Sequence, residues 1–190
     1  MFLPFGFLFL YPIDIYANTK RRSPLMNLKE IKYLIRYLYQ KHGSLLLSTK
    51  EVAREINKSE HWLYLSRKSS IGPSYIKEKT KGVRYRIDHI AAYIYYGNNG
   101  YMTMQEEEIK NFFIDMLYAD YKCQVLTRVE ASKTLGRSTS WLSELNEGPA
   151  YRKNTDSHNG EVRYHFESLI DYVLDLTVTK TVSNHSKEIL

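Results

Sequence analysis

Three lysines stand at alternating positions in the first half of the chain: Lys77, Lys79 and Lys81. In an extended segment, side chains two residues apart point to the same face, so these three ammonium groups would share one surface. Lysine neutralises phosphates and releases their counterions, which gives affinity for nucleic acid without sequence information. The spacing therefore favours contact with a polyanion such as DNA, and a solvated run of charges is the alternative.

A second basic motif occurs twice, at a fixed offset of 79 residues. Val83-Arg84-Tyr85 recurs as Val162-Arg163-Tyr164, and the same offset brings the landmark residues of 28–94 onto those of 107–173. Solenoid repeats run roughly 20–50 residues, so a longer period indicates a duplicated small domain. We therefore expect two copies of one binding unit.

The net charge of +6 is distributed unevenly between the two copies. Residues 26–95 contain 14 Lys and Arg against 6 Asp and Glu, whereas residues 105–190 contain 10 against 14. A basic surface attracts a polyanion and an acidic one repels it. We therefore expect the first copy to bind DNA more strongly, and the second to bind it weakly or to have another role.

Chemistry other than binding has little support in the sequence. It contains no glycine-rich phosphate loop, no nucleophile–base pair and no recognisable motif of paired carboxylates, so we expect no enzymatic activity and no cofactor. His61 has no second His or Cys at ligand spacing, and no metal site is expected. Cys123 is the only cysteine, which excludes an internal disulfide and favours a core residue in a reducing, cytoplasmic protein.

Each copy is expected to begin with helices. Residues 27–41 carry apolar side chains at three- and four-residue steps, which predicts an amphipathic helix that ends near Gly43. Ser48 followed by Glu51 has the pattern of a capping box, in which each residue bonds a backbone N–H of the other. A second helix is therefore expected to start at Ser48.

A short turn is expected to join the second helix to a third. Asn57, and Gly136 at the matched position, tolerate the left-handed conformation that a tight turn requires. Ser59 and Ser138 are expected to cap the third helix. Helix, three-residue turn and helix together form the helix-turn-helix signature. The residues expected to anchor the third helix in the core are Trp62 and Trp141.

A hairpin and a last helix are expected to complete each copy. Residues 83–87 and 162–166 alternate and are rich in β-branched and aromatic side chains, as strands are. With the residues that follow each Gly-Pro pair they would form a hairpin, or wing. Asp88 and Glu167 are expected to open the last helix. The arginine of each Val-Arg-Tyr motif would either contact phosphate or form an ion pair with the nearby carboxylate, Asp88 or Glu167.

These boundaries predict the organisation of the whole chain: an apolar extension (1–25), a basic unit 1 (26–95), a linker (96–104), an acidic unit 2 (105–176) and a flexible tail (177–190). The extension is too short to span a membrane, and its positive charges follow the apolar run instead of preceding it. It is either translated upstream sequence that does not fold, with Met26 the true start, or a packing or membrane-surface segment, or a signal or anchor. A membrane partner is not expected.

The order of helix, tight turn, helix, Gly-Pro, basic-aromatic hairpin and short helix resembles the winged helix-turn-helix domains of phage excisionases and AlpA-type regulators. These domains are related to the DNA-binding domain of MerR regulators. The resemblance covers residues 47–94 and 126–173. It implies a mainly α fold with small β-hairpin wings, in which the second helix of the pair enters the major groove and the wing contacts phosphates or the minor groove.

The resemblance assigns DNA contacts by position. In unit 1 the reading helix and wing would present Lys58, Ser59, His61, Tyr64, Arg67, Lys68, Lys77, Lys79, Lys81, Arg84 and Arg86. In unit 2 the corresponding residues are Arg137, Thr139, Ser140, Arg152, Lys153 and Arg163. Unit 2 also carries Glu161 in its wing, and a carboxylate there repels phosphate.

The sequence therefore favours sequence-specific DNA binding, by a transcriptional regulator or a recombination directionality factor of a mobile element. Two joined readers would bind two half-sites in direct repeat on double-stranded DNA, because covalent linkage raises the effective concentration of the second contact. The alternative is an adaptor that binds a protein partner through unit 2, while only unit 1 contacts DNA.

Overall fold

The computed structural model describes most of the chain between Leu28 and Thr179. The described residues are 28–69, 71–78, 82–97, 104–145, 148–153, 161–176 and 178–179. The predicted extension (1–25) lies outside them, as do Lys79, Lys81, residues 98–103 of the linker and most of the tail. No helix within the described ranges is long and apolar enough to cross a membrane.

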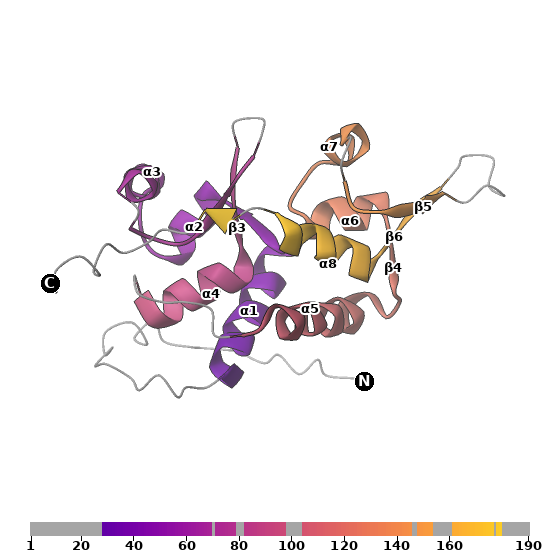
Figure 1. Cartoon of the computed structure of the whole chain (residues 1–190), viewed down its shortest axis with the longest axis horizontal. Coiled ribbons are helices and arrows are strands. Elements are labelled where there is room, and N and C mark those ends of the chain that lie inside the picture. Colours follow the sequence, from indigo (N-terminus) through magenta and orange to yellow (C-terminus); the bar gives the residue numbers. More distant parts are fainter. Residues whose placement is uncertain are drawn as a thin grey trace, which may run out of the picture.

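The described part is mainly helical and carries small antiparallel sheets, as predicted (Figure 1). The first half contains α1 (Leu28–His42), β1 (Leu46–Ser48), α2 (Thr49–Glu55), α3 (Glu60–Lys68), β2 (Tyr75–Lys77), β3 (Val83–Arg86) and α4 (Ile87–Tyr96). The second half repeats this order with α5 (Glu106–Tyr121), β4 (Val125–Thr127), α6 (Arg128–Thr134), α7 (Thr139–Glu144), β5 (Tyr151–Lys153), β6 (Val162–His165) and α8 (Phe166–Asp175). A last strand, β7 (Val178–Thr179), follows.

The predicted starts of α2 and α3 and the tight turn between them are confirmed. Ser48 and Glu51 form the capping box of α2, and the side chain of Ser59 accepts a hydrogen bond from the backbone of Trp62 at the start of α3. Asn57 has φ of 52° and Gly136 has φ of 62°, so both turns use the left-handed conformation. Local side-chain chemistry therefore sets these boundaries.

Three strands were not predicted from the sequence. β1 pairs with β3, and β4 pairs with β6, so that each hairpin gains a third strand from the segment before the helix pair. β7 pairs with β2 of the first half, which gives one four-stranded sheet in the order β1-β3-β2-β7. Two residues of the predicted flexible tail thus return to unit 1 and extend its sheet.

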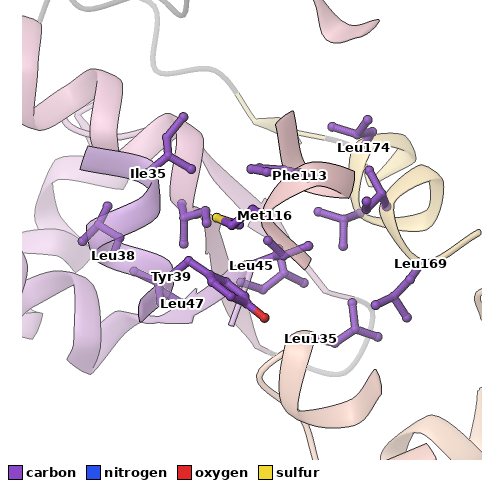
Figure 2. Close-up of a cluster of buried hydrophobic side chains, with 14 of the residues drawn as sticks. Ile35, Leu38, Tyr39, Leu45, Leu47, Phe113, Met116, Leu135, Leu169 and Leu174 are labelled. Carbon is purple, nitrogen blue, oxygen red and sulfur yellow. The ribbon is translucent and has the colours of Figure 1, made fainter. Parts of the chain in front are cut away.

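The buried side chains of both halves form one continuous core. α1 packs on α4, α5 packs on α8, and the two helix pairs meet along a shared apolar cluster (Figure 2). Ile35 and Leu38 from the first half lie in the same cluster as Phe113 and Leu169 from the second. Met104, assigned to the linker from the sequence, is 6% exposed and belongs to this core. The two units are therefore packed against each other.

Backbone contacts also join the two halves. The backbone N–H of Leu45 donates to the carbonyl of Thr134 over 2.7 Å, and the Ser44 hydroxyl donates to the same carbonyl over 3.1 Å. A Cβ atom at Gly136 would stand 2.5 Å from the Leu46 carbonyl oxygen and 2.7 Å from the Ser44 Oγ. Asn57 makes the same turn in the first half, so the close approach of the halves, and not the turn, requires glycine at this position.

We expect Gly136→Asn to destabilise the protein by about 1–3 kcal/mol, the usual cost of forcing atoms into a packed site. Asparagine tolerates the left-handed turn, so the loss reports on the contact between the halves. The matched control Asn57→Gly should change stability by about 1 kcal/mol or less, because Asn57 is exposed. Chemical denaturation measures both, and equal losses would show that the turn alone decides.

Candidate nucleic-acid interface

The elements that the sequence assigned to DNA contact lie along one edge of the molecule. Figure 1 shows α3, the hairpin that contains β3, α7 and the β5–β6 hairpin along the upper edge, with α1 and α5 below them. An ion pair between Glu78, after β2, and Arg137, before α7, brings the first hairpin beside the second helix pair. The arrangement is a row of helix, hairpin, helix and hairpin.

The outward side of α3 is basic and aromatic. His61 and Lys68 are exposed, as is Lys58 in the turn before the helix, and Tyr64 is 45% exposed. The Lys68 ammonium lies 4.5 Å from the centre of the Tyr64 ring, and His61 stacks on the same ring at 6.2 Å. Cations held over aromatic faces are partly ordered in advance, so this surface can present charge and stacking area together.

The side chain of Arg67 is occupied by contacts within the protein. Its guanidinium donates a hydrogen bond to the Tyr85 hydroxyl and lies 5.8 Å from the centre of the Tyr75 ring. Tyr85 is fully buried in β3. Arg67 therefore fixes α3 against the hairpin, and its predicted contact with DNA would have to compete with these partners.

The hairpin of the first half offers Lys77, which is exposed at the end of β2. Arg84 is half-buried beside the Glu51 carboxylate. Burial lowers the pKa of Arg84, while the charge of Glu51 acts in the opposite direction. Lys77 is thus the accessible cation of this hairpin among the described residues, and Arg84 also stabilises the start of α2.

Arg86, one of the predicted DNA contacts, is engaged inside the protein. Its side chain is 6% exposed and binds the fully buried Asp88 through two hydrogen bonds, Nε to Oδ1 at 3.1 Å and Nη2 to Oδ2 at 2.6 Å. The helix predicted to open at Asp88 begins one residue earlier, with Arg86 as its N-cap. Arg86, and not Arg84, is the arginine that pairs with Asp88.

The basic residues of the second half are more engaged with the protein itself. Arg137 pairs with Glu78 and lies 4.8 Å from the centre of the Trp141 ring, so it belongs to the contact between the halves. Arg163 pairs with Glu161 over 2.8 Å. Thr139, Ser140, Arg152 and Lys153 are exposed. Of the residues predicted to contact DNA in this half, those that remain accessible lie on α7 and β5.

Both tryptophans are half-buried against the core, as expected for residues that anchor α3 and α7. Each lies under the cation four residues before it: the Lys58 ammonium is 5.7 Å from the centre of the Trp62 ring, which matches Arg137 over Trp141. The repeat thus preserves an interaction as well as a sequence.

Cys123, predicted as a core residue, is instead exposed after α5.

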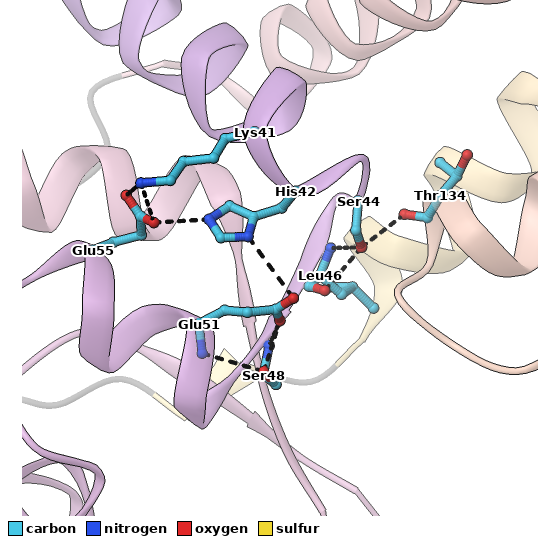
Figure 3. A network of polar contacts seen from close by, with 8 residues as sticks. All are labelled: Lys41, His42, Ser44, Leu46, Ser48, Glu51, Glu55 and Thr134. Carbon is cyan, nitrogen blue, oxygen red and sulfur yellow. Dashed lines mark hydrogen bonds and ion pairs between the residues drawn. The ribbon is translucent and has the colours of Figure 1, made fainter.

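A polar network holds the helix pair of the first half against α1 (Figure 3). The His42 Nε2 atom lies 2.9 Å from the Glu55 carboxylate and Nδ1 lies 3.8 Å from Glu51, while Lys41 binds Glu55 at 2.9 Å. Burial opposes ionisation of Glu51, but hydrogen bonds from Ser48 and the nearby His42 outweigh it and lower the pKa of this carboxyl. The network fixes where α2, and therefore α3, stands on the core.

Sequence reasoning missed two candidate contacts, Lys50 and Arg54, which are exposed on α2. The sequence could have indicated them, because they fall on the outer face of a helix whose inner residues Val52 and Ala53 are buried.

Among the residues that the structure describes, no group of three His, Cys, Asp or Glu side chains is placed to hold a metal ion.

Comparisons with models of known protein families, with curated proteins and with solved structures gave no match for this chain.

Proposed function

We propose that this protein binds double-stranded DNA in a sequence-specific manner through two tandem winged helix-turn-helix units. Its role would be that of a transcriptional regulator or a recombination directionality factor of a mobile element. The α2–α3 and α6–α7 pairs would be the helix-turn-helix elements, with α3 and α7 in the major groove. The β2–β3 and β5–β6 hairpins would be the wings.

The observation that carries this proposal is the surface of α3 and β2. Lys58, His61, Tyr64, Lys68 and Lys77 are all exposed there, beside the β2–β3 hairpin. Lysines would neutralise phosphates, and the imidazole and phenol groups would reach base edges. No other described surface of the first half combines a capped helix, a hairpin and this set of groups.

The alternative, an adaptor in which only unit 1 contacts DNA, has one observation in its favour. Two of the cations assigned to unit 2, Arg137 and Arg163, are paired with Glu78 and Glu161. A cation that is paired with a carboxylate binds phosphate more weakly, because the carboxylate repels the phosphate. In this case α7 and β5 would face a protein partner.

A selection of binding sites from random double-stranded DNA, made with the whole chain, tests the proposal. We expect an enriched motif that occurs twice in the same orientation. Its spacing should have a single value, because the shared core fixes the two units relative to each other. A single unrepeated motif would favour the adaptor, and failure to enrich any sequence would refute specific DNA binding.

A further inference from the structure

The exposed side of α1 is basic and aromatic. Tyr33 is 56% exposed and Tyr37 is 44% exposed, and Lys29 and Arg36 are exposed beside them. An open groove of about 660 Å³ runs along this side of the helix, lined by Leu28, Lys29, Lys32, Tyr33, Arg36 and Phe112. Large aromatic groups left open to water in such a groove are typical of an interaction surface.

The exposed side of α5, the matching helix of the second half, is acidic. α5 contains five acidic residues and one basic residue, whereas α1 contains four Lys and Arg and one Glu. The charge is inverted at matched exposed positions: Arg36 corresponds to Asp115, and Lys41 corresponds to Asp120. Tyr118, 52% exposed, adds an aromatic group to the acidic side.

The two helices already meet within one chain, and this contact shows the chemistry of their surfaces. Lys32 and Glu108 form an ion pair of 2.8 Å, and the Lys32 and Arg36 cations lie 5.7 and 5.6 Å from the centre of the Phe112 ring. Figure 1 shows α1 and α5 on the side of the molecule away from α3 and α7.

We propose that a second copy of this chain docks on the α1 surface with its own acidic α5 surface. A single exposed ion pair contributes little, but several opposite charges that face each other across the contact attract the two copies and set their orientation, and like charges placed opposite each other prevent it. The tyrosines and the groove supply the apolar area that holds the pair together. The proposed contact leaves the candidate nucleic-acid interface open, and it does not depend on the proposed function.

The test is the molar mass of the whole chain in solution, measured by sedimentation or light scattering. We expect self-association at about 0.1 M salt, where the screening length is about 10 Å, and dissociation at about 1 M, where it is about 3 Å. Arg36→Asp and Asp115→Arg, each of which gives both surfaces the same sign at this position, should each be monomeric. Circular dichroism and thermal unfolding confirm that the variants are folded.

The decisive sample is an equimolar mixture of the two variants. The acidic α1 surface of one and the basic α5 surface of the other are complementary again, so the mixture should associate although neither variant does alone. Lys77→Asp, a reversal on the far side, should leave association unchanged. A wild-type chain that is monomeric at every concentration, association that survives both reversals, or a mixture that stays monomeric would each overturn the proposal.

Discussion

Replacing Asp88 by asparagine is expected to destabilise the protein by about 3–5 kcal/mol, the usual cost of breaking a buried ion pair. Asp88 is fully buried and binds Arg86 through both carboxylate oxygens. The asparagine amide would place hydrogen-bond donors against the guanidinium and leave a positive charge uncompensated inside the protein. The midpoint and slope of chemical denaturation measure the loss.

The second half provides a matched control. Glu167 stands at the position of Asp88 and His165 at that of Arg86, but Glu167 is exposed. Glu167→Gln should therefore change stability by about 0.5 kcal/mol or less, as most surface substitutions do. Similar losses of stability at the two positions would mean that burial does not explain the cost of replacing Asp88.

The same pair predicts how acid acts on the protein. Burial alone would raise the pKa of Asp88, but His89 and Arg86 outweigh it, and the pKa lies below its ordinary value. A lowered pKa gives stability that is fully present above the unfolded value, near 3.9, and is lost as pH falls through the folded value. We therefore expect the wild type to lose more stability than Asp88→Asn between neutral and acid pH.

Much of the local structure could be predicted from the sequence because its causes are local. A serine followed three residues later by a glutamate bonds the free backbone N–H groups at the start of a helix. Asn57 or Gly136 then permits the left-handed turn that follows the helix. The strands β1 and β4 were missed because their pairing with β3 and β6 is distant in sequence. A run of three apolar residues, Leu45 to Leu47, was the available signal, and it does not separate a strand from a buried loop.

The candidate site was harder to predict because exposure depends on what packs nearby. Alternation places Arg84 and Arg86 on the same face of β3, yet one is half-buried and the other is 6% exposed. Arg137 looked like a reading-helix residue, and only the packing of the two halves shows that Glu78 lies beside it. Residue type and spacing therefore predict the candidate interface, while tertiary contacts decide which of its cations are accessible.

The affinity for double-stranded DNA is expected to fall steeply with salt. Five exposed cations of the predicted set lie on the candidate interface: Lys58, Lys68, Lys77, Arg152 and Lys153. Each neutralised phosphate contributes about −0.9 to the slope of log K against log salt, so these five would give about −4.5. The affinity should then fall about 500-fold for a fourfold rise in salt. A titration followed by fluorescence anisotropy gives the slope, and an affinity independent of salt would contradict phosphate binding.

Two double variants divide this slope between the units. Lys58→Gln with Lys68→Gln removes two cations from the first helix pair, one in the turn before α3 and one at its end, and Arg152→Gln with Lys153→Gln removes two from β5. If both units bind DNA, each pair should reduce the size of the slope by about 2. If only unit 1 binds it, the second pair should leave the slope unchanged, since charges that touch no phosphate release no counterions. The comparison keeps the loss of charge equal and changes only its place, so it separates two DNA readers from one reader joined to a partner-binding unit.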